Sequence, residues 1–191
     1  MMKKSKKLKF PSELRMDLVS EDWVVIATGR AKKPEAFKKG KQATEATPKK
    51  NCPFCKIIGH NSVIAVSNKY PAFLPHPDLD EKIEGNLYKK MNAVGFHEVV
   101  ITRDHKKQMA RFSIEEIKEV IDVYQERYLE LMLKKFVNYI SIFHNQGQEA
   151  GASITHPHSQ IITTPLIDTD LRNALLNSKK YLTARDCFGK I

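Results

Sequence analysis

The segment formed by residues 143–160 (FHNQGQEAGASITHPHSQ) constrains this chain more than any other part of its sequence. It runs from the end of one apolar stretch, through a loop with two glycines, into the next apolar stretch. Residues two apart in an extended segment project to the same face, so we expect the side chains of His156 and His158 to point the same way. Two imidazoles and the carboxamide of Gln160 can therefore converge on one spot.

The loop that precedes these histidines carries small and neutral polar residues. Gly147 and Gly151 allow the backbone to come close to a ligand, because glycine has no side chain to obstruct it. Asn145, Gln146 and Ser153 offer neutral hydrogen-bond donors suited to a phosphate or a ribose. The pattern favours a binding or catalytic site over a purely structural role for the two histidines.

The cysteines indicate a metal site rather than a disulfide framework. The chain has three of them, Cys52, Cys55 and Cys187, and a small odd number argues against a secreted disulfide scaffold. Cys52 and Cys55 form a CxxC pair, which serves both tetrahedral metal binding and redox chemistry. The pair follows a polar loop, whereas redox pairs usually lie where a strand meets a helix, so we favour a zinc knuckle. Two cysteines supply only half of a tetrahedral zinc site, so metal binding and redox chemistry both stay open until two further ligands are identified.

The apolar patterns predict an α+β chain of mainly antiparallel strands with one long helix. We expect strands at residues 22–28, 62–67, 95–102, 139–144 and 159–163. The long helix begins after Ser113, which forms a capping box with Glu116, and about 23 residues fit its periodicity, to roughly Phe136. Residues 29–51 and 75–92 read as irregular, and a weak helix is expected near 169–180.

The charge distribution favours small anionic partners. The formal net charge is +10, with five lysines in the first nine residues and eight lysines or arginines between residues 30 and 50. These basic runs contain a single aromatic residue and no helical periodicity, so we expect no nucleic-acid binding. No stretch has the roughly 20 apolar residues that span a bilayer, and no apolar segment follows the basic start. We therefore expect a cytoplasmic protein without a membrane segment.

The motifs, taken in order, resemble the galactose-1-phosphate uridylyltransferase family, the transferase branch of the histidine-triad superfamily. HPHSQ after N-x-G-x-x-x-G-x-S is similar to that family's active-site segment. The resemblance extends from about residue 13 to 165 and includes these further segments: Trp23-Val24-Val25 with Arg30-Ala31-Lys32-Lys33-Pro34, the CxxC pair, Asn68-Lys69-Tyr70-Pro71-Ala72, Gly95-Phe96-His97-Glu98-Val99 and Asp104-His105. It implies a histidine-triad-like half-barrel with an antiparallel sheet, one long helix and a zinc knuckle.

The resemblance also implies a role for individual residues. Four of them would bind zinc, a closed set typical of structural sites: Cys52, Cys55, His105 and His156. His158 would be the nucleophile that attacks the α-phosphorus of a nucleotide sugar, and Gln160 would donate to a phosphoryl oxygen. Six residues would line the nucleotide pocket: Arg30, Lys33, Asn68, Asn145, Gly151 and Ser153. The reaction would move UMP between UDP-glucose and a hexose 1-phosphate, such as galactose 1-phosphate.

Two features depart from the best-known members of the family. Those members read S-N-P-H-P-H, whereas this chain reads Ser153-Ile154-Thr155-His156, which resembles a sister branch that includes ADP-glucose phosphorylase. The base, uracil or adenine, therefore stays open. The family also builds its subunit from two similar halves, and this chain has the length of one. We expect a basic tail at 1–12, a domain at 13–165 and the start of a linker to a second half at 166–191, with homodimers where that half is present.

Three functions remain to be compared. The first is nucleotidyl transfer through His158, either uridylyl or, as in ADP-glucose phosphorylase, adenylyl. The second is a zinc-stabilised nucleotide-binding domain with little turnover, because half of the subunit would be missing. The third, nucleotide hydrolysis as in other histidine-triad branches, is disfavoured because Gln160 stands where a third histidine would lie, and glutamine cannot act as a general acid.

Overall fold

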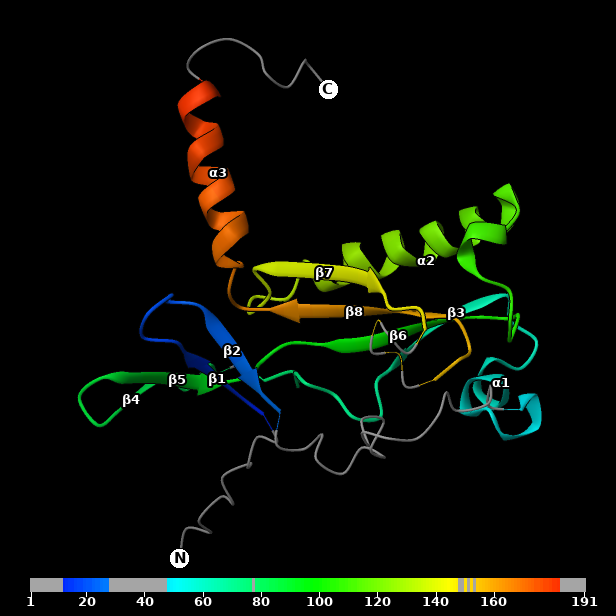
Figure 1. Ribbon diagram of the computed structural model, residues 1–191, viewed down its shortest axis with the longest axis horizontal. Coiled ribbons are helices and arrows are strands. Elements are labelled where there is room, and N and C mark those ends of the chain that lie inside the picture. The colour runs from blue at the N-terminus through cyan, green and yellow to red at the C-terminus, as the bar shows by residue number, and fades with distance from the viewer. Residues whose placement is uncertain are drawn as a thin grey trace, which may run out of the picture.

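The computed structural model describes residues 12–27, 48–76, 78–147, 150, 152 and 154–182. Short strands dominate this part of the chain, together with one long helix and two shorter ones (Figure 1). The elements are β1 Glu13–Met16, β2 Trp23–Ile26, α1 Pro53–Ile58, β3 Val63–Ser67, β4 Lys82–Glu84, β5 Tyr88–Asn92, β6 His97–Thr102, α2 Ile114–Leu131, β7 Tyr139–His144, β8 His158–Thr164 and α3 Thr169–Leu182, with 3-10 turns at Lys49–Asn51 and Met109–Arg111.

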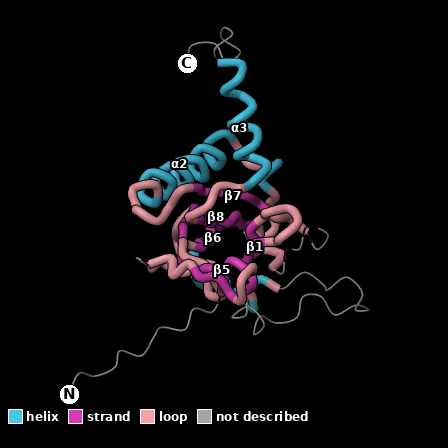
Figure 2. Tube along the Cα trace, turned by 90° about the vertical axis from the view of Figure 1, so that its left-hand side faces the viewer, coloured by secondary structure: helices cyan, strands magenta, loops and turns pink. Residues whose placement is uncertain are grey.

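The strands form two antiparallel sheets of four strands each. Their orders are β2-β1-β5-β4 and β3-β6-β8-β7, and Figure 2 shows strands of both sheets curving around a common centre. This arrangement confirms the expected α+β class, with the antiparallel strands divided between two sheets.

The second sheet is the one that carries the histidine segment, and both of its faces are covered. β6 lies inside this sheet, and all six of its residues are buried. Val100 packs with Leu131 of α2 on one face, while Val99 and Ile101 pack with Phe54 of α1 on the other. The strand expected at residues 95–102 is thus confirmed, and side chains two apart in β6 lie on the same face.

The long helix begins where expected and ends earlier than expected. Ser113 accepts the backbone N–H of Glu116, and the Glu116 carboxylate accepts the backbone N–H of Ser113, so both halves of the capping box are present. The helix ends at Leu131 instead of about Phe136, and the next residues form turns. These turns bring Phe136 onto the ring of Phe96, with ring centroids 5.5 Å apart, so tertiary packing replaced the last turn of the predicted helix.

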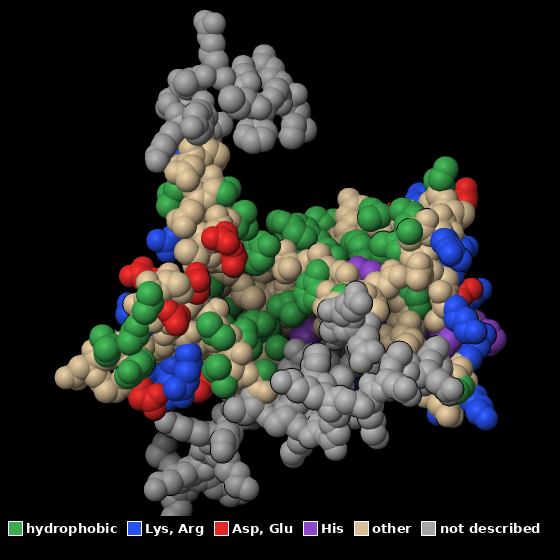
Figure 3. Space-filling model, in the orientation of Figure 1, with side chains coloured by type: hydrophobic (Ala, Val, Ile, Leu, Met, Phe, Trp, Pro, Cys, Tyr) green, Lys and Arg blue, Asp and Glu red, His purple; other side chains and the backbone are tan. Residues whose placement is uncertain are grey.

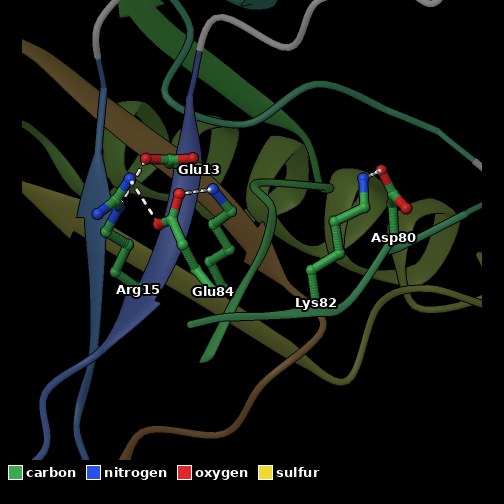
Figure 4. Close-up of polar contacts among 6 residues, drawn as sticks. Glu13, Arg15, Asp80, Lys82 and Glu84 are labelled. Atoms are coloured by element: carbon green, nitrogen blue, oxygen red, sulfur yellow. Dashed lines mark hydrogen bonds and ion pairs between the residues drawn. The ribbon is translucent and has the colours of Figure 1, made fainter. Parts of the chain in front are cut away.

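The expectation that residues 75–92 are irregular was wrong for their second half. Residues 82–92 form the hairpin of β4 and β5, which lies at one edge of the first sheet. Its strands are rich in charge, and ion pairs link them to one another and to β1 (Figure 4). Glu84 on β4 lies 2.8 Å from the amine of Lys90 on the neighbouring β5, and 3.6 Å from the guanidinium of Arg15 on β1, the strand beyond β5. Mostly exposed, charged strands lack the apolar alternation on which the sequence prediction depended.

The C-terminal helix α3 confirms the weak helix expected near residues 169–180. It extends away from both sheets (Figure 1), and its side chains are mostly exposed, Leu175 and Leu176 among them. Among the described helices, none has the length and apolar character needed to cross a membrane.

Candidate functional site

Two cysteines and two histidines from three separate segments meet on the α1 side of the second sheet. Cys52 immediately precedes α1, Cys55 lies in its first turn, His105 follows β6, and His156 precedes β8. Their candidate ligand atoms all lie within 4.8 Å of one another. Cys55 Sγ is 3.2 Å from His105 Nδ1 and 3.3 Å from His156 Nδ1, and Cys52 Sγ is 3.6 Å from His156 Nδ1. The structure therefore brings together the four residues expected to bind metal.

Hydrogen bonding orients His156 as a metal ligand requires. Its Nε2 lies 2.6 Å from the carbonyl oxygen of Thr102 and donates to it, so Nδ1 carries the lone pair and faces the two cysteines. The side chain is fully buried, and this burial lowers the pKa of His156, which favours the neutral imidazole. Burial, followed by the neighbouring Cys52, raises the pKa of the Cys55 thiol. A bound cation would reverse that effect, because it stabilises thiolates.

The local sequence explains how these ligands are presented. Pro53 occupies the first turn of α1, where its fixed φ suits a helix start, so both cysteines lie at that helix N-terminus. Asp104 accepts the backbone N–H groups of Lys106 and Lys107 at 2.8 and 2.9 Å, which closes the turn that carries His105. These two bonds, in that order, are the main reason why the pKa of Asp104 lies below its ordinary value.

His158, the expected nucleophile, is the first residue of β8 and is held by the segment that carries the metal-site histidine. Its Nδ1 lies 2.8 Å from the carbonyl oxygen of His156 and donates to it. The lone pair of the neutral ring therefore lies on Nε2, the nitrogen that points away from the backbone. Phe54 packs against the ring edge, with centroids 4.9 Å apart at an angle of 64°. The imidazole is thus fixed in orientation and in tautomer.

Gln160 lies on the same face of the sheet as His158. The register pairs Ile101 with His158 and Val99 with Gln160, and directly paired residues of an antiparallel ladder share a face. Asn145 directly follows His144, the last residue of β7, which pairs with Ser159 beside His158. Figure 3 shows histidine side chains beside a hydrophobic surface near the centre of the molecule.

Residues 3–167 match the family model described as galactose-1-phosphate uridyl transferase, N-terminal domain. The chain belongs to this family. Among curated proteins, it is 30% identical to an ADP-glucose phosphorylase of Arabidopsis thaliana over 187 residues, covering 88% of this chain and 53% of that protein. It is 28% identical to a galactose-1-phosphate uridylyltransferase of Thermotoga maritima over 160 residues, covering 81% of this chain and 47% of that protein.

Solved structures agree with this membership. A uridylyltransferase structure superposes with a TM-score of 0.72 at 25% identity, covering 92% of this chain and 53% of the other. The ADP-glucose phosphorylase of Arabidopsis thaliana with bound ADP-glucose gives a TM-score of 0.58 at 28% identity, covering 91% of this chain and 55% of the other. The chain thus spans about half the length of the family members that it matches.

Not every residue expected from the family resemblance can be placed. Arg30, Lys33, Gly151 and Ser153 lie outside the described residues. Asn68 is described, and its Oδ1 accepts the backbone N–H of Tyr70 at 2.9 Å, which leaves the amide nitrogen as its donor toward the site. The nucleotide-binding roles of all these residues stay predictions.

The structure adds site residues that the sequence analysis did not single out. Phe54 was read only as the spacer of the CxxC pair, yet its ring contacts both His156 and His158. His97 belongs to an expected strand and to the Gly95–Val99 segment of the family resemblance, neither of which gives it a role, yet its ring contacts Gln160 and Asn68. Both residues lie within segments of the family resemblance, but their roles depend on contacts that only the fold creates.

Proposed function

We propose that the chain carries the nucleophile-bearing half of a nucleotidyltransferase that works through a nucleotidyl-histidine at His158. The observation that supports this most directly is the hydrogen bond from His158 Nδ1 to the carbonyl oxygen of His156. It fixes the lone pair on Nε2, and a fixed neutral imidazole is a good nucleophile toward phosphorus. Membership of the family supports the same class of chemistry.

The reaction has two steps. The Nε2 lone pair of His158 attacks the α-phosphorus of a nucleoside diphosphate hexose, and the bond from that phosphorus to the bridging oxygen breaks. The hexose 1-phosphate leaves with the bonding electron pair. A phosphate oxygen of a second sugar phosphate then attacks the same phosphorus, and the nitrogen–phosphorus bond breaks to regenerate the imidazole.

The support behind His158 suits the charge that develops during the first step. When Nε2 bonds to phosphorus, the ring becomes positively charged while Nδ1 keeps its proton. The carbonyl oxygen of His156, 2.8 Å from Nδ1, is the dipole that stabilises this cation. Gln160, on the same face, would donate its amide N–H to the phosphoryl oxygens. Arg30, Lys33, Asn68, Asn145, Gly151 and Ser153 would line the nucleotide pocket.

We assign zinc to the group of Cys52, Cys55, His105 and His156. The donor set of two thiolates and two imidazoles fits zinc, and the Nδ1 lone pair of His156 already faces the cysteines. A closed four-ligand site of this kind supplies structural cross-linking rather than Lewis-acid chemistry. Its proposed role is to hold the 156–158 segment, and with it the backbone carbonyl that orients His158.

For the substrate, we propose UDP-glucose as the donor and galactose 1-phosphate as the acceptor, in a cytoplasmic, homodimeric enzyme of galactose metabolism. A second candidate is adenylyl transfer of the ADP-glucose phosphorylase type. It is favoured by the Ser153-Ile154-Thr155 flank and by the 30% identity to the Arabidopsis protein. A zinc- and nucleotide-binding domain with little turnover is the third, because the chain spans about half of its relatives.

Trapping the covalent intermediate tests the proposal. The chain is mixed with UDP-glucose or ADP-glucose, and intact-mass spectrometry measures the gain of one covalently bound uridylyl or adenylyl group. We expect one adduct per chain, with the preferred base given by the faster of the two reactions. His158→Ala should abolish it, since no neighbouring group replaces the attacking imidazole, and His158→Gly should regain part of the transfer when imidazole is added.

The control variant is His144→Ala, which changes a histidine at the end of β7 that pairs with Ser159 and so lies on the opposite face of the second sheet. The His144 imidazole contacts the hydroxyl of Ser159, which also contacts Tyr124. The His144→Ala variant should still form the adduct. An adduct that persists in His158→Ala would refute the nucleophile. If the wild-type chain forms none, the measurement is repeated with a polypeptide that carries the second half of a relative. A chain that binds nucleotide and still forms no adduct is the binding domain of the third candidate.

A further inference from the structure

His97 lies where β6 begins, and its hydrogen bonds join β6 to two other segments of the site. It is 4% exposed and pairs in register with Ile162 of β8. Its Nε2 is 2.9 Å from Oε1 of Gln160, and its Nδ1 is 3.0 Å from the backbone nitrogen of Ala72. The ring therefore spans from the segment after β3 to the side chain next to the proposed nucleophile.

The backbone fixes the direction of these bonds. The N–H of Ala72 can only donate, so Nδ1 of His97 must accept and carries the ring's lone pair. In the neutral ring the proton is then on Nε2, which donates to Oε1 of Gln160. Asn68 Nδ2 also lies 2.9 Å from this Nε2. The Asn68 side-chain oxygen already accepts the Tyr70 N–H, so the amide nitrogen that faces His97 can only donate. The acceptor for the Nε2 proton of His97 is therefore Oε1 of Gln160.

We propose that His97 is a positioning residue that sets which end of the Gln160 amide faces the phosphoryl group. A glutamine amide has an oxygen that repels phosphate oxygens and an NH₂ group that binds them. With the oxygen held by His97, the NH₂ group is the end left to face the ligand. Without His97, the amide can rotate by half a turn and present its oxygen, which would oppose the anionic transition state.

This inference rests on the proposed function for the role of Gln160, while the orientation of Gln160 can be tested without it. Two amide variants separate the two bonds of His97. In His97→Gln the amide nitrogen reaches about as far as Nε2, so it can donate to Gln160 while the Ala72 contact is lost. In His97→Asn the amide reaches only as far as Nδ1, so it can accept from Ala72 but cannot hold Gln160.

The kinetic experiment measures the rate of adduct formation at His158 in these variants. Gln160→Ala should slow the rate by about 100-fold, as for loss of one transition-state donor. We expect His97→Asn to slow it by about 10-fold or more and His97→Gln to lie closer to wild type. Because His97 acts through Gln160, adding His97→Asn to Gln160→Ala should cost nothing further. Independent, multiplying effects, or a His97→Gln slower than His97→Asn, would overturn the proposal.

The second experiment needs no turnover. In ¹⁵N-labelled protein, the side-chain amide resonance of Gln160 is identified by its loss in Gln160→Ala. We expect this resonance to move in His97→Asn and to stay near its wild-type position in His97→Gln. A Gln160 resonance that His97→Asn leaves unmoved would overturn the positioning role. This measurement decides the role of His97 even if no adduct forms. The absence of an adduct would count against the proposed function and not against the positioning role.

Discussion

At the residue scale, Gly95 determines how closely the segment before β6 can approach β8. A β-carbon added there would lie 2.0 Å from the carbonyl oxygen of Thr163, a backbone atom that no rotamer change can move. Two further hydrogen bonds lock this approach: the N–H of Phe96 donates to Thr163 Oγ1 at 2.8 Å, and the N–H of Thr163 donates to the carbonyl oxygen of Phe96 at 3.0 Å. A larger residue at position 95 must therefore push β8, and with it Gln160, away.

We expect Gly95→Ala to destabilise the protein by about 1–3 kcal/mol, the usual cost of overpacking, in urea unfolding. The matched control is Gly85→Ala, because Gly85 has a positive φ of 62° and nothing within 4 Å of the added carbon. That control carries only the backbone strain of alanine at positive φ, about 1 kcal/mol. Equal losses in the two variants would show that β8 yields easily at this point.

The metal site gives a second prediction at this scale. Purified protein should hold one zinc per chain, and Cys52→Ser should lose it and unfold at a lower temperature. Structural zinc contributes on the order of 10 kcal/mol in small zinc modules, so the change should be large. Cys187→Ser, outside the described residues, should keep both the zinc and the stability. Metal analysis with well under one zinc per chain in folded protein, together with a harmless Cys52→Ser, would contradict the assignment.

How much of the site could be predicted depends on whether a sequence motif marks each residue. His158 and Gln160 follow from the HPHSQ segment, and the CxxC pair is visible in any sequence. His105 is 50 residues from Cys55, and only the family resemblance connected them before the structure did. His97 could not be found, because its role depends on Ala72 and Gln160, which lie 25 and 63 residues away in the chain.

At the element scale, an ion pair joins α2 to the second sheet. Arg127 donates to both carboxylate oxygens of Glu98 on β6, at 2.8 and 2.7 Å. The two side chains are 19% and 9% exposed. The hydrogen bond to Glu98 is the largest of the causes that raise the pKa of Arg127. Two parallel bonds of a planar guanidinium to a mostly buried carboxylate fix both position and direction.

We expect Glu98→Gln to cost about 2 kcal/mol of unfolding free energy, because hydrogen bonds to charged groups contribute roughly 1.5–3 kcal/mol. The amide would also place an NH₂ group against the guanidinium. The control is Asp122→Asn, which breaks the exposed pair with Lys118 on the same helix and should cost less than about 0.5 kcal/mol. Urea unfolding of both variants would test this, and a loss no larger than the control's would mean that apolar packing alone docks α2.

The elements that were predicted correctly share an apolar pattern that continues over five or more residues. Residues 139–144 form β7 as expected, and β6 lies within the strand expected at 95–102. β1 was missed because ELRM is four residues long and half charged. α1 was missed because six residues are fewer than two turns, too few for a 3.6-residue period to show. The conformation of such short elements is determined by tertiary contacts, which a local sequence pattern does not reveal.

At the scale of the whole molecule, basic side chains gather near α1, at the end where the metal site lies, while the hairpin end carries mixed charge (Figure 3). The two sheets form the body that carries the site, and α3 stands outside it (Figure 1). The start of α3 is held by its own local bonds, because Asp168 accepts the backbone N–H groups of Asp170 and Leu171. A domain ending at residue 165 stays a prediction that truncation can test.

We expect a chain that ends at Ile167 to keep its zinc, its nucleotide binding and its unfolding free energy within about 0.5 kcal/mol, the usual range for surface changes. The physical reason is that α3 buries little: Leu175 and Leu176 are each about half exposed, and most side chains described in this helix are exposed. Urea unfolding and metal analysis of the truncated and full chains measure this. A chain that ends at Ala150, before β8, is the contrasting control and should fail to fold, since it lacks His156 and an interior strand of the second sheet. Loss of zinc or of stability on truncation at Ile167 would show that the residues from 168 onward belong to the folded domain.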